Sequence, residues 1–260
     1  MGSMDHFSFG WLTPVLSYAM ACVGAALGLR CTLRALSATG ASRRNWLLTA
    51  AAAIGSGIWT MHFVAMFGFT VNGTELRYDV PLTVLSLLIA IAVVGLGVFV
   101  VGHGRHRGRS LLLGGLTTGV GVAAMHYLGM AAVRIHGELR YSFGTVTLSV
   151  LIAVAAATAA LWAAVTIRNV YAAAAASLVM GIAVSCMHYT GMAAVHVHME
   201  PARIGLGGAT PMQFVFPLAV GLGSFLFLTA AFVSLSPTAQ ESAAYREAGE
   251  LAVEELGRAA

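Results

Sequence analysis

Charged side chains are scarce in this chain, and lysine is absent altogether. Asp, Glu, Lys and Arg make up 9% of the 260 residues, whereas a soluble globular domain carries about 25%. All 14 basic residues are arginine, and the formal net charge is +4. This composition excludes an ordinary soluble domain, and so small a positive charge gives no reason to expect a nucleic-acid partner.

Cysteine is also rare. The three cysteines, Cys22, Cys31 and Cys186, all fall in apolar segments, so we expect no disulfide framework. The first apolar run has neither a basic segment before it nor a small-residue cleavage site after it, which argues against a signal peptide. We expect residues 1–10 to comprise an expression-tag scar and a short segment on the outer side of a membrane.

Long apolar runs take the place of charge. Hydrophobic residues make up 58% of the sequence, and runs of about 20 apolar residues are long enough to cross a bilayer as helices. The pattern predicts an all-α, polytopic membrane bundle of seven transmembrane helices, which forms one domain over residues 11–236. The expected spans are 11–36, 45–69, 81–102, 110–133, 143–167, 170–195 and 211–235, and Pro217 is expected to kink the last one.

Arginine placement predicts the orientation of the bundle. The links on one side contain few carboxylates and carry most of the arginines, namely Arg30, Arg34, Arg43, Arg44, Arg105, Arg107, Arg109 and Arg168. Because arginine-rich loops stay in the cytoplasm, we expect the N-terminus outside and the C-terminus inside. Residues 237–260 are expected to form a cytoplasmic tail helix that begins with a capping box. This helix is either solvated or a docking surface, for example in a homodimer.

Three near-copies of one motif, G-x5-M-H-[FY]-x-x-M, are the most informative feature. Their histidines, His62, His126 and His188, lie 64 and 62 residues apart. That period equals two spans with their links, so the chain is interpreted as three two-helix repeats after an initial helix. The motif helices then run in the same direction, and the histidines are expected at one depth, about 10 Å below the outer surface.

Helical spacing predicts which methionines accompany the histidines. The methionine four residues after each histidine lies about 40° from it on a helical wheel, whereas the methionine directly before it lies about 100° away. The predicted ligands are therefore His62, His126, His188, Met66, Met130 and Met192. Met61, Met125 and Met187 are expected to be flanking groups that could still swing in. The glycine seven positions before each histidine is expected to allow close helix approach.

The donor set indicates a soft or borderline metal ion. Imidazole nitrogen and thioether sulfur favour copper, most easily Cu(I), and no motif contains a carboxylate that would favour calcium, magnesium or manganese. Zinc could use three histidines and a water, and haem could use two axial ligands, so both stay open. A purely structural role for histidines that hydrogen-bond between helices also stays open, although ionisable side chains inside a membrane generally have a function.

Other candidate residues are less informative. His196, His198 and Met199 follow the third motif and could receive a metal on the outer side, although a solvated loop is the simpler interpretation. Tyr127 and Tyr189 follow the second and third histidines, but the first copy has phenylalanine there. We therefore interpret these aromatic residues as interfacial packing rather than as an essential set of phenols.

The segments Met125-His126-Tyr127 and Met187-His188-Tyr189-Thr190 resemble the MHYT family, which is named after that tetrapeptide. The resemblance covers nearly the whole chain and implies a bacterial integral membrane sensory domain, proposed to bind copper and through it to sense oxygen, carbon monoxide or nitric oxide. It implies that both methionines and the histidine of each motif are ligands. The first copy departs from the family pattern, with Phe63 and Val64 in place of Tyr and Thr.

In many relatives such a domain is followed by cyclic di-GMP synthesis and hydrolysis domains or by a DNA-binding output. None is recognisable after residue 237, so we expect no catalytic residues and a cytoplasmic signalling partner. The leading interpretation is a copper-binding sensor in the bacterial cytoplasmic membrane, with the lipid bilayer and a diatomic gas as its other partners. The alternatives are a copper- or haem-dependent membrane oxidoreductase and a protein of metal acquisition or transfer.

Overall fold

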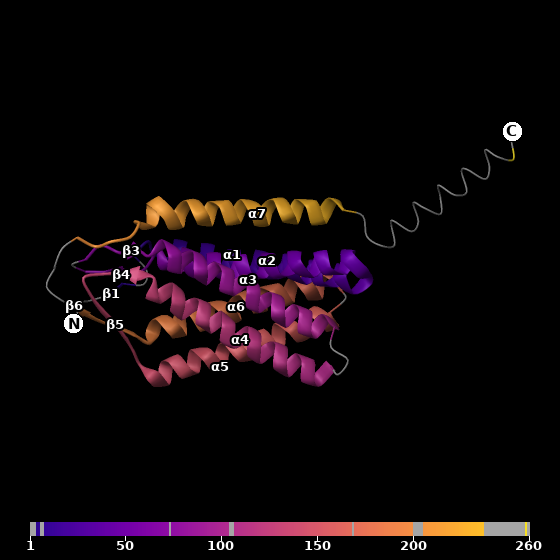
Figure 1. Ribbon diagram of the computed structural model, residues 1–260, viewed down its shortest axis with the longest axis horizontal. Helices are drawn as coiled ribbons and strands as arrows, with labels where there is room; N and C mark the ends of the chain where they lie inside the picture. The colour runs from indigo at the N-terminus through magenta and orange to yellow at the C-terminus, as the bar shows by residue number, and fades with distance from the viewer. Residues whose placement is uncertain are drawn as a thin grey trace.

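The computed structural model describes residues 4–5, 8–72, 74–103, 107–167, 169–199, 205–236 and 258. This part of the chain contains seven helices that are long and apolar enough to cross a membrane, which confirms the predicted all-α architecture (Figure 1). The helices are α1 (Leu12–Ser37), α2 (Gly40–Met66), α3 (Val80–His103), α4 (Arg107–Ala131), α5 (Phe143–Thr166), α6 (Val170–Ala193) and α7 (Phe216–Leu235). The predicted tail helix over 237–260 lies outside the described residues, apart from residue 258.

Helices α1 to α6 form a closed ring. Each of them packs against its neighbours in chain order, and α6 closes the ring by packing against α1. Helices α2, α4 and α6, which carry the motifs, also contact one another. Helix α7 lies outside this ring and runs along α1 and α2 (Figure 1).

Three short antiparallel strand pairs lie at one end of the bundle, where the sequence predicts only loops. Each pair joins the strand before an odd-numbered helix to the strand after the following even-numbered helix. The pairs are β1 (Met4–Asp5) with β2 (Thr70–Val71), β3 (Arg77–Tyr78) with β4 (Val133–Arg134), and β5 (Gly137–Tyr141) with β6 (Val195–Met199). We call this the strand-bearing end.

The strand pairing defines how the repeats are grouped in space. Each unit is a strand, two helices and a strand, so the units pair α1 with α2, α3 with α4 and α5 with α6. The helix outside this threefold arrangement is therefore the last one, whereas the motif spacing alone placed it first. The three units together give the ring a pseudo-threefold axis, around which α2, α4 and α6 are equivalent.

Glycine allows the motif helices to approach their neighbours closely, as predicted. A methyl group on Gly55 of α2 would lie 2.7 Å from the Cα atom of Ile91 in α3, and one on Gly119 of α4 would lie 2.4 Å from the Cα atom of Val154 in α5. Gly181 of α6 makes the equivalent close contact with side chains of α1. At Gly55 and Gly119 the nearest atoms belong to the backbone of the neighbouring helix, so a larger residue would push the helices apart.

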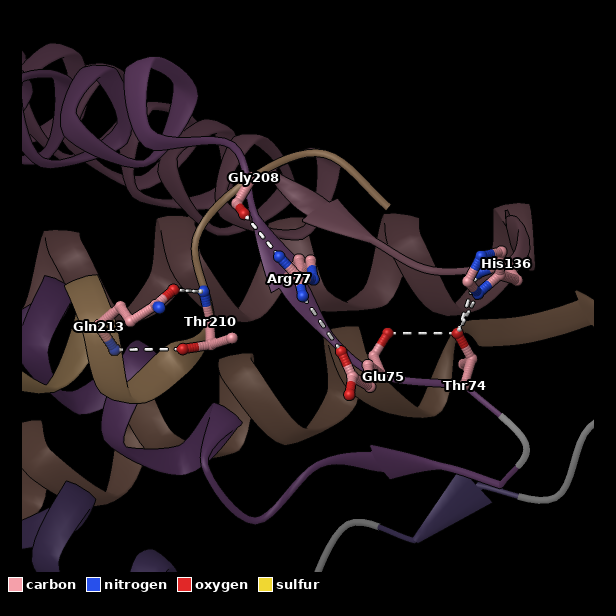
Figure 2. A network of polar contacts seen from close by, with 7 residues as sticks. All are labelled: Thr74, Glu75, Arg77, His136, Gly208, Thr210 and Gln213. Carbon is pink, nitrogen blue, oxygen red and sulfur yellow. Dashed lines mark hydrogen bonds and ion pairs between the residues drawn. The ribbon is translucent and has the colours of Figure 1, made fainter. Parts of the chain in front are cut away.

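Polar contacts fasten the links at the strand-bearing end, and Figure 2 shows part of this network. Arg77 donates to the carbonyl of Gly208 (3.3 Å) and forms an ion pair with Glu75 (3.4 Å). Thr210 and Gln213 form a capping box that starts a π-helical turn, Pro211–Val215. This turn passes into α7 directly before Pro217, which has no amide hydrogen to donate. Pro217 thus lies in the first turn of α7, and the kink expected there stays a prediction.

Candidate metal centre

The last turns of α2, α4 and α6 bring the three motif histidines to one point inside the bundle. His62, His126 and His188 are buried, with at most 1% of each exposed. Their Nδ1 atoms form a triangle whose sides are 3.0 Å between His62 and His188, 3.1 Å between His62 and His126, and 3.3 Å between His126 and His188. The histidines therefore lie at one depth, as the repeat period predicts.

The three imidazole rings are nearly perpendicular to one another. Their centroids are 4.9 to 5.1 Å apart, and their planes meet at 78° to 88°. A point equidistant from the three Nδ1 atoms lies about 1.8 Å from each, because the centre of a triangle with sides near 3.1 Å is one side length divided by √3 away. Metal–nitrogen bonds are about 2.0 Å long, so this triangle has the size of a three-nitrogen metal site.

Hydrogen bonding alone does not satisfy this cluster. A neutral imidazole has one donor and one acceptor nitrogen. If no Nδ1 atom carries a proton, the three nitrogen lone pairs repel one another. If one Nδ1 atom is protonated, it can donate to only one of the other two. The Nε2 atoms of His62 and His126 have no hydrogen-bond partner among the described residues. A cation at the centre would satisfy all three Nδ1 atoms at once, so the donor set fits a metal ion.

The histidines are also the one group of three or more His, Cys, Asp and Glu side chains, within the described part of the chain, that lie close enough to hold a single ion. All six motif methionines are also buried: Met61, Met66, Met125, Met130, Met187 and Met192. The structure thus brings the three histidines together within a methionine-rich core. A direct bond from any sulfur to the ion stays a prediction.

Small residues inside the motif make room for the imidazole rings, a feature that the sequence alone did not predict. A methyl group on Gly129 of α4 would lie 2.6 Å from Nε2 of His62, and one on Gly191 of α6 would lie 2.4 Å from Nε2 of His126. Both glycines stand three positions after a motif histidine, and the first copy has Ala65 at that place. The second and third motifs therefore each supply a histidine and a glycine that makes room for the histidine of a neighbouring helix. The recurrence of a small residue at this spacing was the available signal.

Aromatic residues next to the motif histidines form hydrogen bonds to the neighbouring helices. Tyr127, which directly follows His126, hydrogen-bonds to Ser149 of α5 (2.6 Å between the oxygens). Phe63 has no hydroxyl group in the first copy, but Trp59, one turn earlier on α2, donates to Ser86 of α3 over 2.9 Å.

Tyr127 therefore does more than pack at the membrane interface, because its hydroxyl group links α4 to α5. The two serines, Ser86 and Ser149, are fully buried, and each donates to the carbonyl three residues before it. These bonds orient the serine oxygens to accept hydrogen bonds from Trp59 and Tyr127.

Among the described residues, the histidines of the outer links join no second cluster that could hold an ion. His196 and His198 lie on β6 opposite Arg140 and Glu138 of β5, so the predicted solvated loop is a strand. His196 is exposed and contacts the carbonyl of Ala194 (3.1 Å). A cationic arginine opposite His196 makes this pair a poor place to capture a metal ion.

Comparisons with known proteins agree with the motif. A sequence profile of the MHYT family, described as a bacterial signalling protein N-terminal repeat, matches residues 55–115 and 119–177. The bifunctional diguanylate cyclase/cyclic di-GMP phosphodiesterase MucR of Pseudomonas aeruginosa is 40% identical over 192 residues, which are 72% of this chain and 28% of MucR. The cyclic di-GMP phosphodiesterase NbdA of the same organism is 43% identical over 158 residues, 58% of this chain and 20% of NbdA.

A more distant relative is the signaling protein YkoW of Bacillus subtilis, which is 30% identical over 209 residues, 77% of this chain and 26% of YkoW. The chain thus spans less than a third of the length of these relatives. No solved structure matches it significantly. With two profile matches that include the first two motifs, relatives that contain the same domain, and seven helices able to cross a membrane, this chain belongs to the MHYT family of bacterial integral membrane signalling proteins.

Proposed function

We propose that this protein is a membrane sensor whose three motif histidines hold a copper ion and which responds to oxygen, carbon monoxide, nitric oxide or redox state. The observation that carries the proposal is the triangle of buried Nδ1 atoms, with sides of 3.0 to 3.3 Å. Ionisable side chains inside a membrane are costly, and they persist where they have a function.

The geometry favours copper over haem. The axial ligands of a haem lie on opposite faces of a wide macrocycle, whereas these three nitrogens are all about 3 Å apart with no room for a ring between them. Zinc would require a fourth ligand, because its sites are tetrahedral. Thioether and imidazole donors suit Cu(I), and all six motif methionines are buried.

A bound Cu(I) would supply a coordination position that a diatomic gas could share or compete for. The chain's own contribution is to hold the imidazoles in place and exclude water. Helices α2, α4 and α6 run from the histidines to the opposite end of the bundle. A change in the size of the triangle would move their far ends, which we propose face the cytoplasm and its signalling partner. The names of MucR and NbdA point to cyclic di-GMP turnover as the process under control.

Metal analysis of the purified protein tests the proposal. We expect about one copper ion per chain, and we expect His62→Ala, His126→Ala and His188→Ala each to weaken copper binding at least tenfold, since each removes one of three ligands. His196→Ala is the matched control, because it removes an exposed imidazole from β6. Full copper binding in all three motif variants would refute the assignment.

Methionine variants separate the two candidate sulfur sets. If the wheel geometry is right, Met66→Leu, Met130→Leu and Met192→Leu weaken Cu(I) binding, and the leucine variants of Met61, Met125 and Met187 do so less. Met212→Leu is the control, because its side chain is 65% exposed at the start of the π-helical turn. Equal copper affinity in all six motif variants would leave the imidazoles as the only ligands and contradict a role for sulfur.

A further inference from the structure

An apolar cavity of about 70 Å³ lies inside the ring of helices, on the side of the histidines away from the strand-bearing end. All six ring helices contribute to its wall. Most of the lining residues are alanine, valine, leucine or isoleucine, and α5 provides a row of five alanines: Ala153, Ala156, Ala157, Ala160 and Ala164.

The cavity begins one helical turn from the histidine triangle. Ile58, Val122 and Val184 line it, and each stands four positions before a motif histidine. Positions four apart share a helix face and are separated by about 6 Å along the axis. The residues eight positions before the histidines line it as well: Ile54, Thr118 and Met180. The cavity therefore starts on the pseudo-threefold axis, on the helix faces that carry the imidazoles.

The cavity has the properties of a dry site. Thr118 supplies its one polar side chain, and the hydroxyl of Thr118 donates to the carbonyl of Val93 (3.4 Å). A water molecule needs two to four polar partners, and apolar cavities that are larger than a water molecule stay empty or bind xenon and small apolar molecules. The volume is several times the roughly 10–15 Å³ that one water requires, so size does not prevent occupation.

One part of the wall faces the lipid. Ala156 and Ala160 of α5 and Met180 of α6 line the cavity and are half-buried, whereas Ala153 and Ala157 are buried. The barrier between lipid and cavity is therefore thin, since it consists of methyl groups and one flexible methionine. Small apolar molecules dissolve in hydrocarbon, so the lipid is the natural source of a ligand for this cavity.

We propose that this cavity takes up a small apolar molecule of diatomic size from the lipid, between α5 and α6, and delivers it to the histidine triangle. The proposal deepens the proposed function, because it rests on a gas-responsive centre at the histidines. It assigns the ligand-holding role to the alanine face of α5 and to the residues one turn from the histidines. The ligand reaches the centre without crossing the polar links of the strand-bearing end.

Xenon is a suitable probe, because it binds apolar cavities without any need for a metal. We expect xenon-pressurised crystals of metal-free protein to show an anomalous peak between Val122, Ala157 and Val184. Ala157→Leu fills the cavity and should abolish the peak. Ala159→Leu makes the same change at an exposed position on the same helix and should preserve it. No peak in the wild type, or an undiminished peak in Ala157→Leu, would overturn the proposal.

Two further measurements complete the test. If Ala157→Leu does not fold, Ala157→Val adds less volume, and we expect it to lower xenon occupancy relative to Ala159→Val. In copper-loaded protein, carbon monoxide should associate about tenfold more slowly with Ala157→Leu than with Ala159→Leu, and equal rates would refute delivery through the cavity. Xenon binding does not require a metal ion. If only the copper assignment is wrong, the xenon peak and its loss in Ala157→Leu are still observed, whereas a wrong cavity assignment removes that pattern.

Discussion

His62, His126 and His188 show why a threefold arrangement suits a site inside a membrane. A single imidazole in hydrocarbon would leave at least one ring nitrogen without a partner. Three imidazoles from equivalent helices place their Nδ1 atoms within 3.3 Å of one another, so one central cation can satisfy all of them. The cost of burying the histidines is thus offset when the ion binds, which couples metal binding to the packing of α2, α4 and α6.

Gly129→Ala tests whether α4 fixes the position of the His62 imidazole. The added methyl group would lie 2.6 Å from Nε2 of His62, so the imidazole must shift out of the triangle. We expect copper affinity to fall at least tenfold and the folded state to lose about 1–3 kcal/mol, which is typical of overpacking. Metal titration and thermal unfolding in detergent would measure both effects.

The control for this change is Gly221→Ala in α7. A methyl group at Gly221 has no atom within 4 Å, and alanine is the better helix former. Copper affinity should therefore stay unchanged, and stability should stay the same or rise slightly. If Gly129→Ala binds copper as tightly as Gly221→Ala does, the role given to Gly129 is wrong.

Residues with a repeated local signature were predictable, and their partners were not. The motif histidines could be located because Met-His-aromatic recurs inside apolar runs at one spacing. The hydrogen bond between Trp59 and Ser86 could not be predicted, because it joins two different helices. In the first motif copy, the indole of Trp59 takes the place of the hydroxyl group that Phe63 lacks. The substitution is visible only when α2 and α3 are side by side.

At the scale of elements, Asp79 connects a strand pair to the start of a membrane helix. Its carboxylate accepts a hydrogen bond from Arg134 of β4 (2.8 Å) and another from the backbone amide of Leu82 in the first turn of α3 (3.1 Å). These contacts, with Arg134 contributing most, lower the pKa of Asp79 below its usual value. The charged form is therefore favoured in the folded protein.

The variant Asp79→Asn tests this connection through its pH dependence. Because the folded pKa lies below the unfolded value of about 3.9, the charge stabilises the fold at neutral pH, and this stabilisation is lost as the pH falls through the folded pKa. We expect the wild type to exceed Asp79→Asn in melting temperature at pH 7 and the difference to shrink below about pH 4. Histidine titration affects both proteins alike, so it cancels in the difference. A difference that is constant with pH, or grows in acid, would contradict the role.

Helices were predictable from sequence because each one satisfies its own backbone hydrogen bonds within a run of about 20 apolar residues. The strands were not, because β1 and β2 contain two residues each and pair across more than 60 positions of chain. Their pairing depends on the ring of helices already bringing those ends together. The same dependence explains why the grouping of helices into repeats required the structure.

At the scale of the whole molecule, the two ends of the helix ring differ in their charged residues. The strand-bearing end carries the strand pairs, the nearby histidines and mixed charges such as the ion pair of Arg140 with Glu138. The opposite end carries arginines without acidic partners in the sequence around them, such as Arg43 and Arg44 at the start of α2. This asymmetry predicts that the strand-bearing end faces outward, and the direction decides whether a signal at the histidines travels into the cell.

Cysteine labelling in whole cells tests that direction. In a variant without Cys22, Cys31 and Cys186, a small membrane-impermeant maleimide should label Glu138→Cys in intact cells, because this exposed side chain lies at the strand-bearing end. The matched variant Ser42→Cys, exposed at the opposite end, should be labelled only after the membrane is permeabilised. The reverse pattern would mean that the arginines do not set the orientation. The histidines would then lie near the cytoplasmic face, and the far ends of α2, α4 and α6 would lie outside the cell. A cytoplasmic partner could not contact those far ends, so the proposed signalling route would be wrong.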